Sequence, residues 1–329
     1  MDQYNPPYEI TNQILEYVAS ISEKVGRISV TTNLDNKPHL RKNNKIKSVY
    51  SSLKIEANSL SLDQVYSVIN GKIVLGKQKD IQEVKNAYET YEQFEMIDPY
   101  SIEDLKKYHG VMTKYLVTES GTFRKGEEGV FNGEKCIFMA PPAWLVPNLV
   151  QQLFTWINEQ KDHVHPLILS CVFHYEFVFI HPFVDGNGRM ARLWQNVILG
   201  KWNFIFEYLP IESQIEKFQS DYYDVIALCH KEGESTAFIE FMLKQIDQVL
   251  DDIVKESKDY ASMSYQVKKL LDSMEYDVYY TSRELMEKLG LKSHNGFMKN
   301  YLHPALQQNR IEMTIPDKPR SKNQRYIKK

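Results

Sequence analysis

Residues 181–192 read His-Pro-Phe-Val-Asp-Gly-Asn-Gly-Arg-Met-Ala-Arg, and this stretch decides how the rest of the chain is interpreted. Its Gly-Asn-Gly turn leads into a predicted helix, and such a turn leaves unpaired N–H groups at the positive end of the helix dipole, which favours phosphate. Arg189 and Arg192 lie on one side of that helix and add fork-shaped donors. Asp185 suits a hard cation such as Mg²⁺, and His181 is a titratable group close by. The stretch predicts a nucleotide triphosphate site with a base beside it.

Length and composition set the class of protein. The chain has 329 residues, a net charge of −3 and 43% hydrophobic residues, which predicts two or three domains with cores that need no metal or disulfide. A charge this close to neutral argues against a chain that binds polyanions as a whole. The three cysteines, Cys136, Cys171 and Cys229, are far apart and odd in number, so the sequence indicates neither a disulfide framework nor a zinc cluster.

The location of the protein is also predicted from its sequence. The first residues, Met-Asp-Gln-Tyr-Asn-Pro-Pro, lack the basic and apolar regions of a signal peptide. No apolar run approaches the roughly 20 residues that span a bilayer. We therefore expect a cytoplasmic protein that does not associate with membranes.

Helical periodicity dominates the chain, so we expect a mainly α fold. The predicted helices lie near residues 9–25, 47–57, 61–70, 78–96, 102–117, 145–160, 164–180, 189–200 and 215–230. One β-hairpin is predicted at residues 128–140, because Asn132-Gly133 stands between two apolar stretches and Pro141-Pro142 ends the second.

The chain is expected to contain three regions, an N-terminal helical region (1–98), a central core (99–248) and a C-terminal part (249–329). The last begins with a polar linker helix at 249–264 and continues with a helix at Ser264–Ser273. Thr281 and Glu284 then give a capping-box start to a short helix that ends at Gly290. A further helix and two short strands complete the predicted order, which is typical of a winged helix.

The stretch at 181–192 resembles the signature of the Fic (filamentation induced by cAMP) family, His-x-Phe-x-Asp/Glu-Gly-Asn-Gly-Arg-x-x-Arg, at every fixed position. The apolar helix Cys171–Ile180 is similar to the one that precedes the catalytic loop in Fic proteins. The resemblance implies a Fic-type helical core in which the 128–140 hairpin is the flap beside the nucleotide.

The resemblance also implies a protein adenylyltransferase, which moves AMP from ATP to a Ser, Thr or Tyr hydroxyl of a target protein. In that mechanism His181 is the general base and Asp185 positions Mg²⁺ on the α- and β-phosphates. Asn187 and the N–H groups of the Gly186–Gly188 turn stabilise charge on the α-phosphoryl group, and Arg189 holds the β- and γ-phosphates.

Other activities within the family are weighed on the same residues. A relative that transfers phosphate lacks the second glycine and the last arginine of the motif, which Gly188 and Arg192 supply here. Adenylylation is therefore favoured. Removal of AMP from a modified protein, known for relatives with an inhibitory glutamate, stays open.

A built-in inhibitor is predicted at residues 47–58, which resemble the inhibitory helix of Fic proteins. Ser52 and Glu56 occupy its two key positions, while Ala57 stands where Gly or Asn is usual. We expect Glu56 to pair with Arg192 in the space that the γ-phosphate needs. The alternative is a solvated glutamate on an amphipathic helix.

Two further segments are expected near the nucleotide. The flap residues Cys136, Ile137, Phe138 and Met139 would lie over it, unless the hairpin is merely a surface element. Tyr222 and Tyr223 resemble a tyrosine pair at the adenine end. Because adjacent helical residues point in different directions, at most one should touch the base, and ordinary packing is the equal alternative.

The C-terminal end is strongly basic. Residues 292–329 hold nine Lys and Arg against Glu312 and Asp317, a balance of +7 that leaves −10 for residues 1–291. This concentration could contact DNA phosphates, so a DNA-binding regulator with a vestigial core is the rival hypothesis. The expected partner is a target protein, for which the chain itself is one candidate. A second copy of the chain in a homodimer is another expected partner, since dimers are common in relatives.

Overall fold

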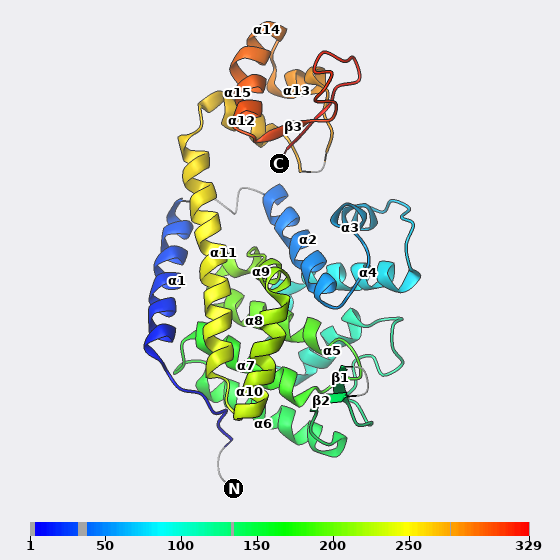
Figure 1. Ribbon diagram of the computed structural model, residues 1–329, viewed down its shortest axis with the longest axis vertical. Helices are drawn as coiled ribbons and strands as arrows, with labels where there is room; N and C mark the ends of the chain where they lie inside the picture. Colours follow the sequence, from blue (N-terminus) through cyan, green and yellow to red (C-terminus); the bar gives the residue numbers. More distant parts are fainter. Residues whose placement is uncertain (1–3, 32–37, 133–134, 277, 329) are drawn as a thin grey trace. The chain divides into compact units, whose positions relative to one another are not determined.

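The computed structural model describes residues 4–31, 38–132, 135–276 and 278–328 (Figure 1). It is mainly helical, as predicted. The chain divides into two compact units, residues 1–34 with 44–252 and residues 35–43 with 253–329. The first unit thus contains most of the predicted N-terminal region together with the predicted core.

Helices make up most of the chain before residue 263. They are α1 (Asn12–Thr31), α2 (Pro38–Ile55), α3 (Leu62–Ile69), α4 (Gln78–Glu92), α5 (Ile102–Met112), α6 (Val146–Gln160), α7 (Pro166–Ile180), α8 (Asn187–Trp202), α9 (Ile211–Lys217), α10 (Gln219–Glu232) and α11 (Thr236–Ser262). Short 3₁₀ turns lie at Phe94–Met96, Ala143–Leu145 and Phe204–Glu207.

The core of the first unit forms around α7 and α8, which pack against each other in the middle of the unit (Figure 1). In α7 every residue from Leu167 to Phe177 is buried, and in α8 every residue from Arg189 to Leu199 is buried. A helix that is buried all round has no polar face to turn toward water, which explains the nearly continuous apolar run of α7. The loop between these two helices is therefore held on both sides by rigid structure.

Several helix boundaries differ from the predicted ones. The helix expected at 102–117 ends at Met112, and Tyr115 adopts a left-handed backbone with φ of 65°. The polar linker expected at 249–264 belongs to α11, which begins at Thr236. Its apolar face before residue 250 and its polar end form one helix of 27 residues.

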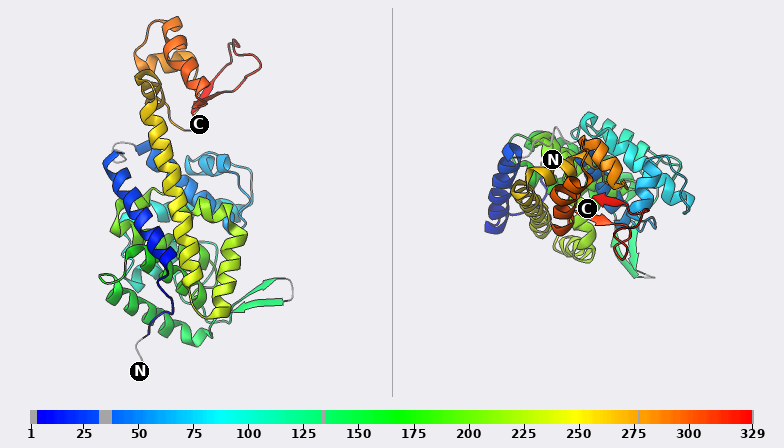
Figure 2. Two further views of the ribbon diagram at one scale, coloured as in Figure 1. Left: turned by 60° about the vertical axis from the view of Figure 1, so that its left-hand side comes forward. Right: turned by 90° about the horizontal axis from the view of Figure 1, so that it is seen from above.

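The predicted hairpin is present as β1 (Gly129–Asn132) and β2 (Lys135–Met139), an antiparallel pair. The register runs from Gly129 opposite Met139 to Asn132 opposite Lys135, with an irregularity after Val130. Gly133, one of the predicted turn residues, lies outside the described residues. The hairpin projects from the helices of its unit (Figure 2, left).

The second unit has its own core. Its elements are α12 (Tyr265–Ser273), α13 (Ser282–Leu289), α14 (His294–Phe297), a π-helical turn (Met298–Leu302), α15 (His303–Gln307), β3 (Ile311–Met313) and β4 (Tyr326–Lys328). The capping box between Thr281 and Glu284 is formed, and Gly290 ends α13 with φ of 68°. Buried side chains from every helix and both strands fill the interior, among them Val267, Leu285, Phe297, Leu302 and Tyr326. This order of helices and strands is the predicted one, and the winged-helix interpretation stays a prediction.

No helix within the described parts of the chain is both long enough and apolar enough to cross a membrane.

Candidate active site

The candidate site is built on the loop between α7 and α8. His181 follows the last residue of α7 and adopts a left-handed backbone with φ of 50° and ψ of 59°. Its N–H still donates to the carbonyl of Phe177, so the helix stops at this residue. Gly186, with φ of 84°, begins α8 in a backbone conformation that favours glycine. The motif thus supplies the end of one helix, a turn and the start of the next.

Asn187 holds the loop in shape. Its Oδ1 accepts from the N–H of Phe183 at 2.9 Å, and its Nδ2 donates to the carbonyl of the same residue at 2.7 Å. We expected this side chain to stabilise charge on a phosphoryl group. These two bonds brace the turn, but Nδ2 carries a second N–H besides the one given to Phe183, so the expected contact of Asn187 with a phosphoryl group stays a prediction.

His109, on α5, packs against the same loop and donates a hydrogen bond to it. Its ring stacks on Phe183 with centroids 3.6 Å apart and planes 5° from parallel. The N–H of Gly121 donates to Nδ1 at 3.0 Å, so Nε2 carries the proton and donates to the carbonyl of Asp185 at 2.9 Å. Burial lowers the pKa of His109 to about 4, and the ring therefore stays neutral.

The His181 imidazole has the protonation that a base requires. Its Nδ1 lies 3.3 Å from the carbonyl oxygen of Val178, which can only accept, so Nδ1 carries the proton and Nε2 holds the lone pair. Burial lowers the pKa of His181, while the Val178 carbonyl raises it by a smaller amount. The imidazole is thus favoured in the neutral form.

The start of α8 is open toward an anion but is covered by Glu56. Gly186 gives the helix no side-chain cap, so the first N–H groups of α8 are not satisfied by a capping side chain. A Cβ added to Gly188 would collide with Glu56 Oε1, which places that carboxylate directly over the helix start. The position that attracts a phosphate is therefore filled by a carboxylate of the chain itself.

Arg192 fixes this carboxylate. Its Nη2 donates to Glu56 Oε1 at 2.7 Å and to the carbonyl of Ser52 at 3.0 Å, and its Nε donates to Ser52 Oγ at 3.2 Å. The guanidinium is only 2% exposed. Burial acts to lower the pKa of Arg192, but the charge and hydrogen bond of Glu56 together with Tyr222 and Tyr223 raise it by more, so the arginine stays charged.

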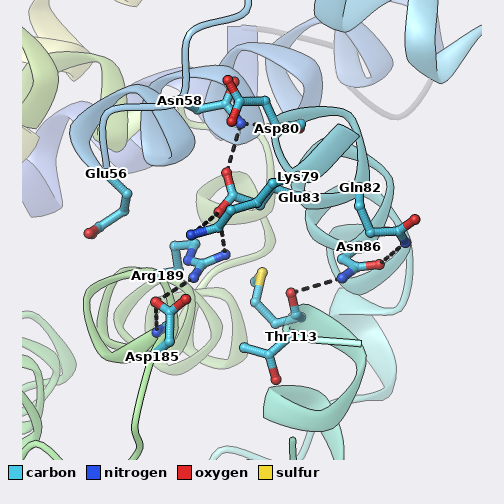
Figure 3. Close-up of polar contacts among 12 residues, drawn as sticks. Glu56, Asn58, Lys79, Asp80, Gln82, Glu83, Asn86, Thr113, Asp185 and Arg189 are labelled. Carbon is cyan, nitrogen blue, oxygen red and sulfur yellow. Dashed lines mark hydrogen bonds and ion pairs between the residues drawn. The ribbon is translucent and has the colours of Figure 1, made fainter. Parts of the chain in front are cut away.

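Glu56 reaches Arg192 because α2 ends just before it. Ala57 takes a left-handed backbone with φ of 63°, and the N–H of Asn58 donates to the carbonyl of Leu53 at 3.1 Å. This is the reversal by which many helices end. Asn58 then donates to Glu83 on α4 at 2.8 Å and to the carbonyl of Asp80 at 3.1 Å, which fastens the segment (Figure 3).

Arg189 has unused donors. Its Nη2 donates to Asp185 Oδ1 at 2.8 Å, and its Nη1 lies 3.8 Å from Glu83 Oε1, beyond hydrogen-bond distance (Figure 3). Its Nε and Nη1 are buried and have no hydrogen-bond partner in the described chain. Buried guanidinium nitrogens normally bind an acceptor, so these two suit a phosphate oxygen.

Asp185 meets the requirements of a Mg²⁺ ligand. Its side chain is 37% exposed, and its Oδ1 also accepts from the N–H of Gly186. Among the described residues, no three His, Cys, Asp or Glu side chains gather as metal ligands. A single accessible carboxylate beside a phosphate site fits Mg²⁺, which is commonly held by one or two carboxylates and the substrate phosphates.

The sequence model described as the Fic/DOC family matches residues 99–199, and the model of the Fic-like C-terminal domain matches residues 265–327. The crystal structure of a Fic family protein from Desulfovibrio desulfuricans is 44% identical, covers 99% of this chain and 98% of its own, and superposes with a TM-score of 0.74. The chain belongs to the Fic family.

More distant Fic proteins match a smaller part of the chain. Protein adenylyltransferase Fic of Drosophila melanogaster is 28% identical over 212 residues, which are 62% of this chain and 41% of that protein. The chain thus spans about two fifths of the length of the curated relatives it matches. Fic-1 from C. elegans is 21% identical over 75% of this chain and 73% of its own, with a TM-score of 0.61, and shows the fold alone.

In this Fic protein the hairpin that was expected to be the flap contacts α10, while one of the two tyrosines is buried and the other is exposed. Phe138 stacks on His230 of α10 with centroids 3.9 Å apart, and Met139 is exposed. Cys136 and Ile137 have side chains outside the described residues. Tyr222 is buried and its hydroxyl lies 2.9 Å from His174 Nε2, so it packs in the interior. For Tyr222 this is the packing alternative, and contact of the tyrosine pair with a nucleotide stays a prediction.

Tyr223 is the more accessible member of the pair. It is 46% exposed, and its hydroxyl lies 3.5 Å from the carbonyl of Ile55, at the end of α2. Only this tyrosine is free to meet a ligand, in agreement with the expectation that the two side chains point in different directions.

Sequence reasoning did not assign a role to three residues near the motif, His109, Glu83 and Arg124. His109 and Glu83 stand alone in their segments. Arg124 ends the stretch Gly121-Thr-Phe-Arg124, which with the 128–140 hairpin resembles the flap of Fic proteins, but the stretch does not indicate what Arg124 binds. The apolar spacing of α5 includes His109 simply as one buried position. Their importance arises only when folding brings α4, α5 and the hairpin to the loop.

Proposed function

We propose that this Fic protein transfers AMP from ATP to a hydroxyl group of a protein, and that Glu56 holds it in an inhibited state. The observation that carries the proposal is the neutral imidazole of His181, with its lone pair on Nε2, on the loop that leads into the open helix start and its two buried arginines. The name of the Drosophila relatives, protein adenylyltransferase, points the same way.

The reaction forms a bond from the acceptor oxygen to the α-phosphorus and breaks the bond from that phosphorus to the oxygen that bridges to the β-phosphate. The proton of the hydroxyl passes to His181 Nε2, a transfer typically worth 10²–10⁴ in rate. Pyrophosphate leaves with the charge of its oxygens opposed by Arg189. Mg²⁺ bound to Asp185 would neutralise part of the phosphate charge.

The backbone N–H groups at the start of α8 would hold the phosphoryl oxygens. They are fixed before the reaction by the Asn187 amide and by the stack of His109 on Phe183. Donors that are held in place need no reorganisation as charge develops, which is the main source of this kind of catalysis.

Inhibition follows from the position of Glu56. Its carboxylate covers the helix start and engages Arg192, so a triphosphate must displace it before both arginines can bind phosphate. Competition for one guanidinium, together with charge repulsion, should weaken productive ATP binding by about 1–3 kcal/mol, which is about 5–150-fold in affinity.

The test is to incubate wild type, Glu56→Gly and His181→Ala with Mg²⁺ and ATP that carries label at either the α- or the γ-phosphate. We expect label from the α-position to enter protein, most strongly with Glu56→Gly, and none with His181→Ala. Glu89→Gln, an exposed glutamate of α4, is the matched control and should behave as wild type. Label that enters from γ but not from α would overturn adenylylation.

Removal of AMP is the second candidate, because the inhibitory carboxylate lies at the phosphate site, against Gly188 and Arg192. Protein labelled by Glu56→Gly provides the substrate. If wild type releases AMP from it and Glu56→Gly does not, the chain works in both directions and Glu56 takes part in the reverse one.

Within the described part of residues 292–329 six basic side chains are exposed, Lys292, Lys299, Lys318, Arg320, Lys322 and Arg325. Arg310 and Lys328 are engaged within the unit, by Asp259 and by the carbonyl of Leu271. DNA contact by this unit stays a prediction. A salt-dependent gel shift with duplex DNA, absent when residues 292–329 are removed, would support it.

A further inference from the structure

Arg124 links the end of α7 to the base of the hairpin. It is 2% exposed, and its backbone N–H donates to the carbonyl of Pro182 at 2.9 Å. Its Nε donates to the carbonyl of His181 at 2.7 Å, and its Nη2 lies 3.4 Å from the carbonyl of Ile180. Arg124 therefore binds three consecutive residues at the helix end, two through its buried side chain and one through its backbone.

The end of α7 needs such donors. The last carbonyls of a helix have no partner within the helix, and the left-handed turn at His181 directs two of them, those of Ile180 and His181, to Arg124. A cation is also favoured at this end of a helix by the helix dipole. The guanidinium thus satisfies the helix end that holds the His181 ring.

The same guanidinium binds both ends of the hairpin. Its Nη1 donates to the carbonyl of Gly126, before β1, at 2.9 Å, and its Nη2 donates to the carbonyl of Pro141, after β2. The N–H of Ala140 donates to the carbonyl of Glu128 at 3.0 Å and closes the base of the hairpin between them. A planar fork of donors reaches two segments at once, which a lysine cannot do.

We infer that Arg124 is a positioning residue that fixes His181 relative to the base of the hairpin. The inference rests on the proposed function for its catalytic consequence, and on the hairpin being the flap along which a target docks, as the resemblance to Fic proteins implies. Such a target presents its hydroxyl to His181 only if the hairpin and His181 keep a set separation. A misplacement of the reacting groups by about 1 Å lowers the rate by about 10²-fold. The start of α8, Arg189 and Arg192 share no hydrogen bond with Arg124 in the described structure.

The experiment compares Arg124→Lys and Arg124→Gln with Lys125→Gln, the exposed neighbour, all in the Glu56→Gly background. We expect Arg124→Lys to keep its ATP affinity and to lose about 10²-fold in kcat, with a higher KM for the target protein. Lys125→Gln should match the background in every readout. An Arg124→Lys variant with unchanged kcat would overturn the inference, and so would a loss of ATP affinity as large as the loss of rate.

Hydrogen exchange supplies a readout that does not depend on catalysis. In Arg124→Lys the amides of His181 and Ala140, which donate to the carbonyls of Phe177 and Glu128, should exchange faster, while those of the second half of α8 should not change. Uniformly faster exchange throughout the first unit would show general destabilisation and would overturn the inference. If the Glu56→Gly background transfers no AMP, the proposed function fails, and the exchange pattern still decides whether Arg124 couples His181 to the hairpin.

Discussion

Glu56 Oε1 lies too close to Gly188 to leave room for a Cβ there, and it is 2.7 Å from Arg192 Nη2. The glycine of the motif thus gives room to the inhibitory carboxylate, and the second arginine holds it there. The same two features favour a phosphate, so the inhibitor and the substrate compete for one place.

Replacement of Glu56 by Gly should strengthen ATP binding. The charge that opposes the triphosphate disappears and Arg192 is released, so we expect an affinity increase of about 5–150-fold. Isothermal titration calorimetry in Mg²⁺ measures it. Glu89→Gln, which removes an exposed carboxylate, should leave the affinity unchanged. Equal affinities of wild type and Glu56→Gly would contradict competition.

Gly188→Ala should destabilise the first unit only while Glu56 is present. The added methyl meets Glu56 Oε1 in wild type, whereas in Glu56→Gly its main neighbour is Arg192 Nη1, at 3.1 Å, which need shift by only a few tenths of an ångström. A double-mutant cycle should therefore show a coupling of about 1 kcal/mol or more. Urea unfolding followed by tryptophan fluorescence reports on this unit, because all four tryptophans belong to it. Additive effects would exclude the close approach.

Ala57→Gly should stabilise the chain. Ala57 adopts φ of 63°, a left-handed conformation that costs a residue with a Cβ about 1 kcal/mol relative to glycine. We expect the free energy of unfolding to rise by about that amount in the same urea experiment. Ala19→Gly, at an exposed position inside α1, is the matched control and should lower it by about 1 kcal/mol.

The acid limb of the rate profile should lie below the ordinary pKa of histidine. Burial lowers the pKa of His181 from 6.5, and a base acts only when it is unprotonated, so activity should persist at pH values where an exposed histidine is protonated. The Glu56 charge raises this pKa, so its removal lowers the midpoint further. The profile of kcat/KM for Glu56→Gly measures the midpoint. A midpoint at or above 6.5 would contradict the assignment.

The sequence predicted those parts of the site that are continuous in the chain. Residues 181–192 hold the helix end, the turn and both arginines, so their local structure follows from their order. Glu56 and Arg192 are 136 residues apart, and only the family resemblance linked them. His109 and Arg124 could not be predicted, because what they do depends on carbonyls that the fold brings to them.

The tyrosine pair and α11 also have features that could not be predicted from the sequence. Spacing predicted that Tyr222 and Tyr223 point apart, but not which of them is buried. The polar end of α11 reads as a separate linker because the apolar face that continues from Thr236 fades after Leu250. Periodicity locates the face of a helix more reliably than its end.

The left-handed backbone of His181 also constrains the length of α7. The residue that terminates this helix is the one that carries the proposed base, so an added or deleted residue anywhere in Pro166–Ile180 would turn the imidazole by about 100° around the helix axis. We expect α7 to tolerate substitutions without a change in the direction of the imidazole, but not insertions or deletions. The number of residues between His165 and His181 should therefore be the same in every functional variant of this chain.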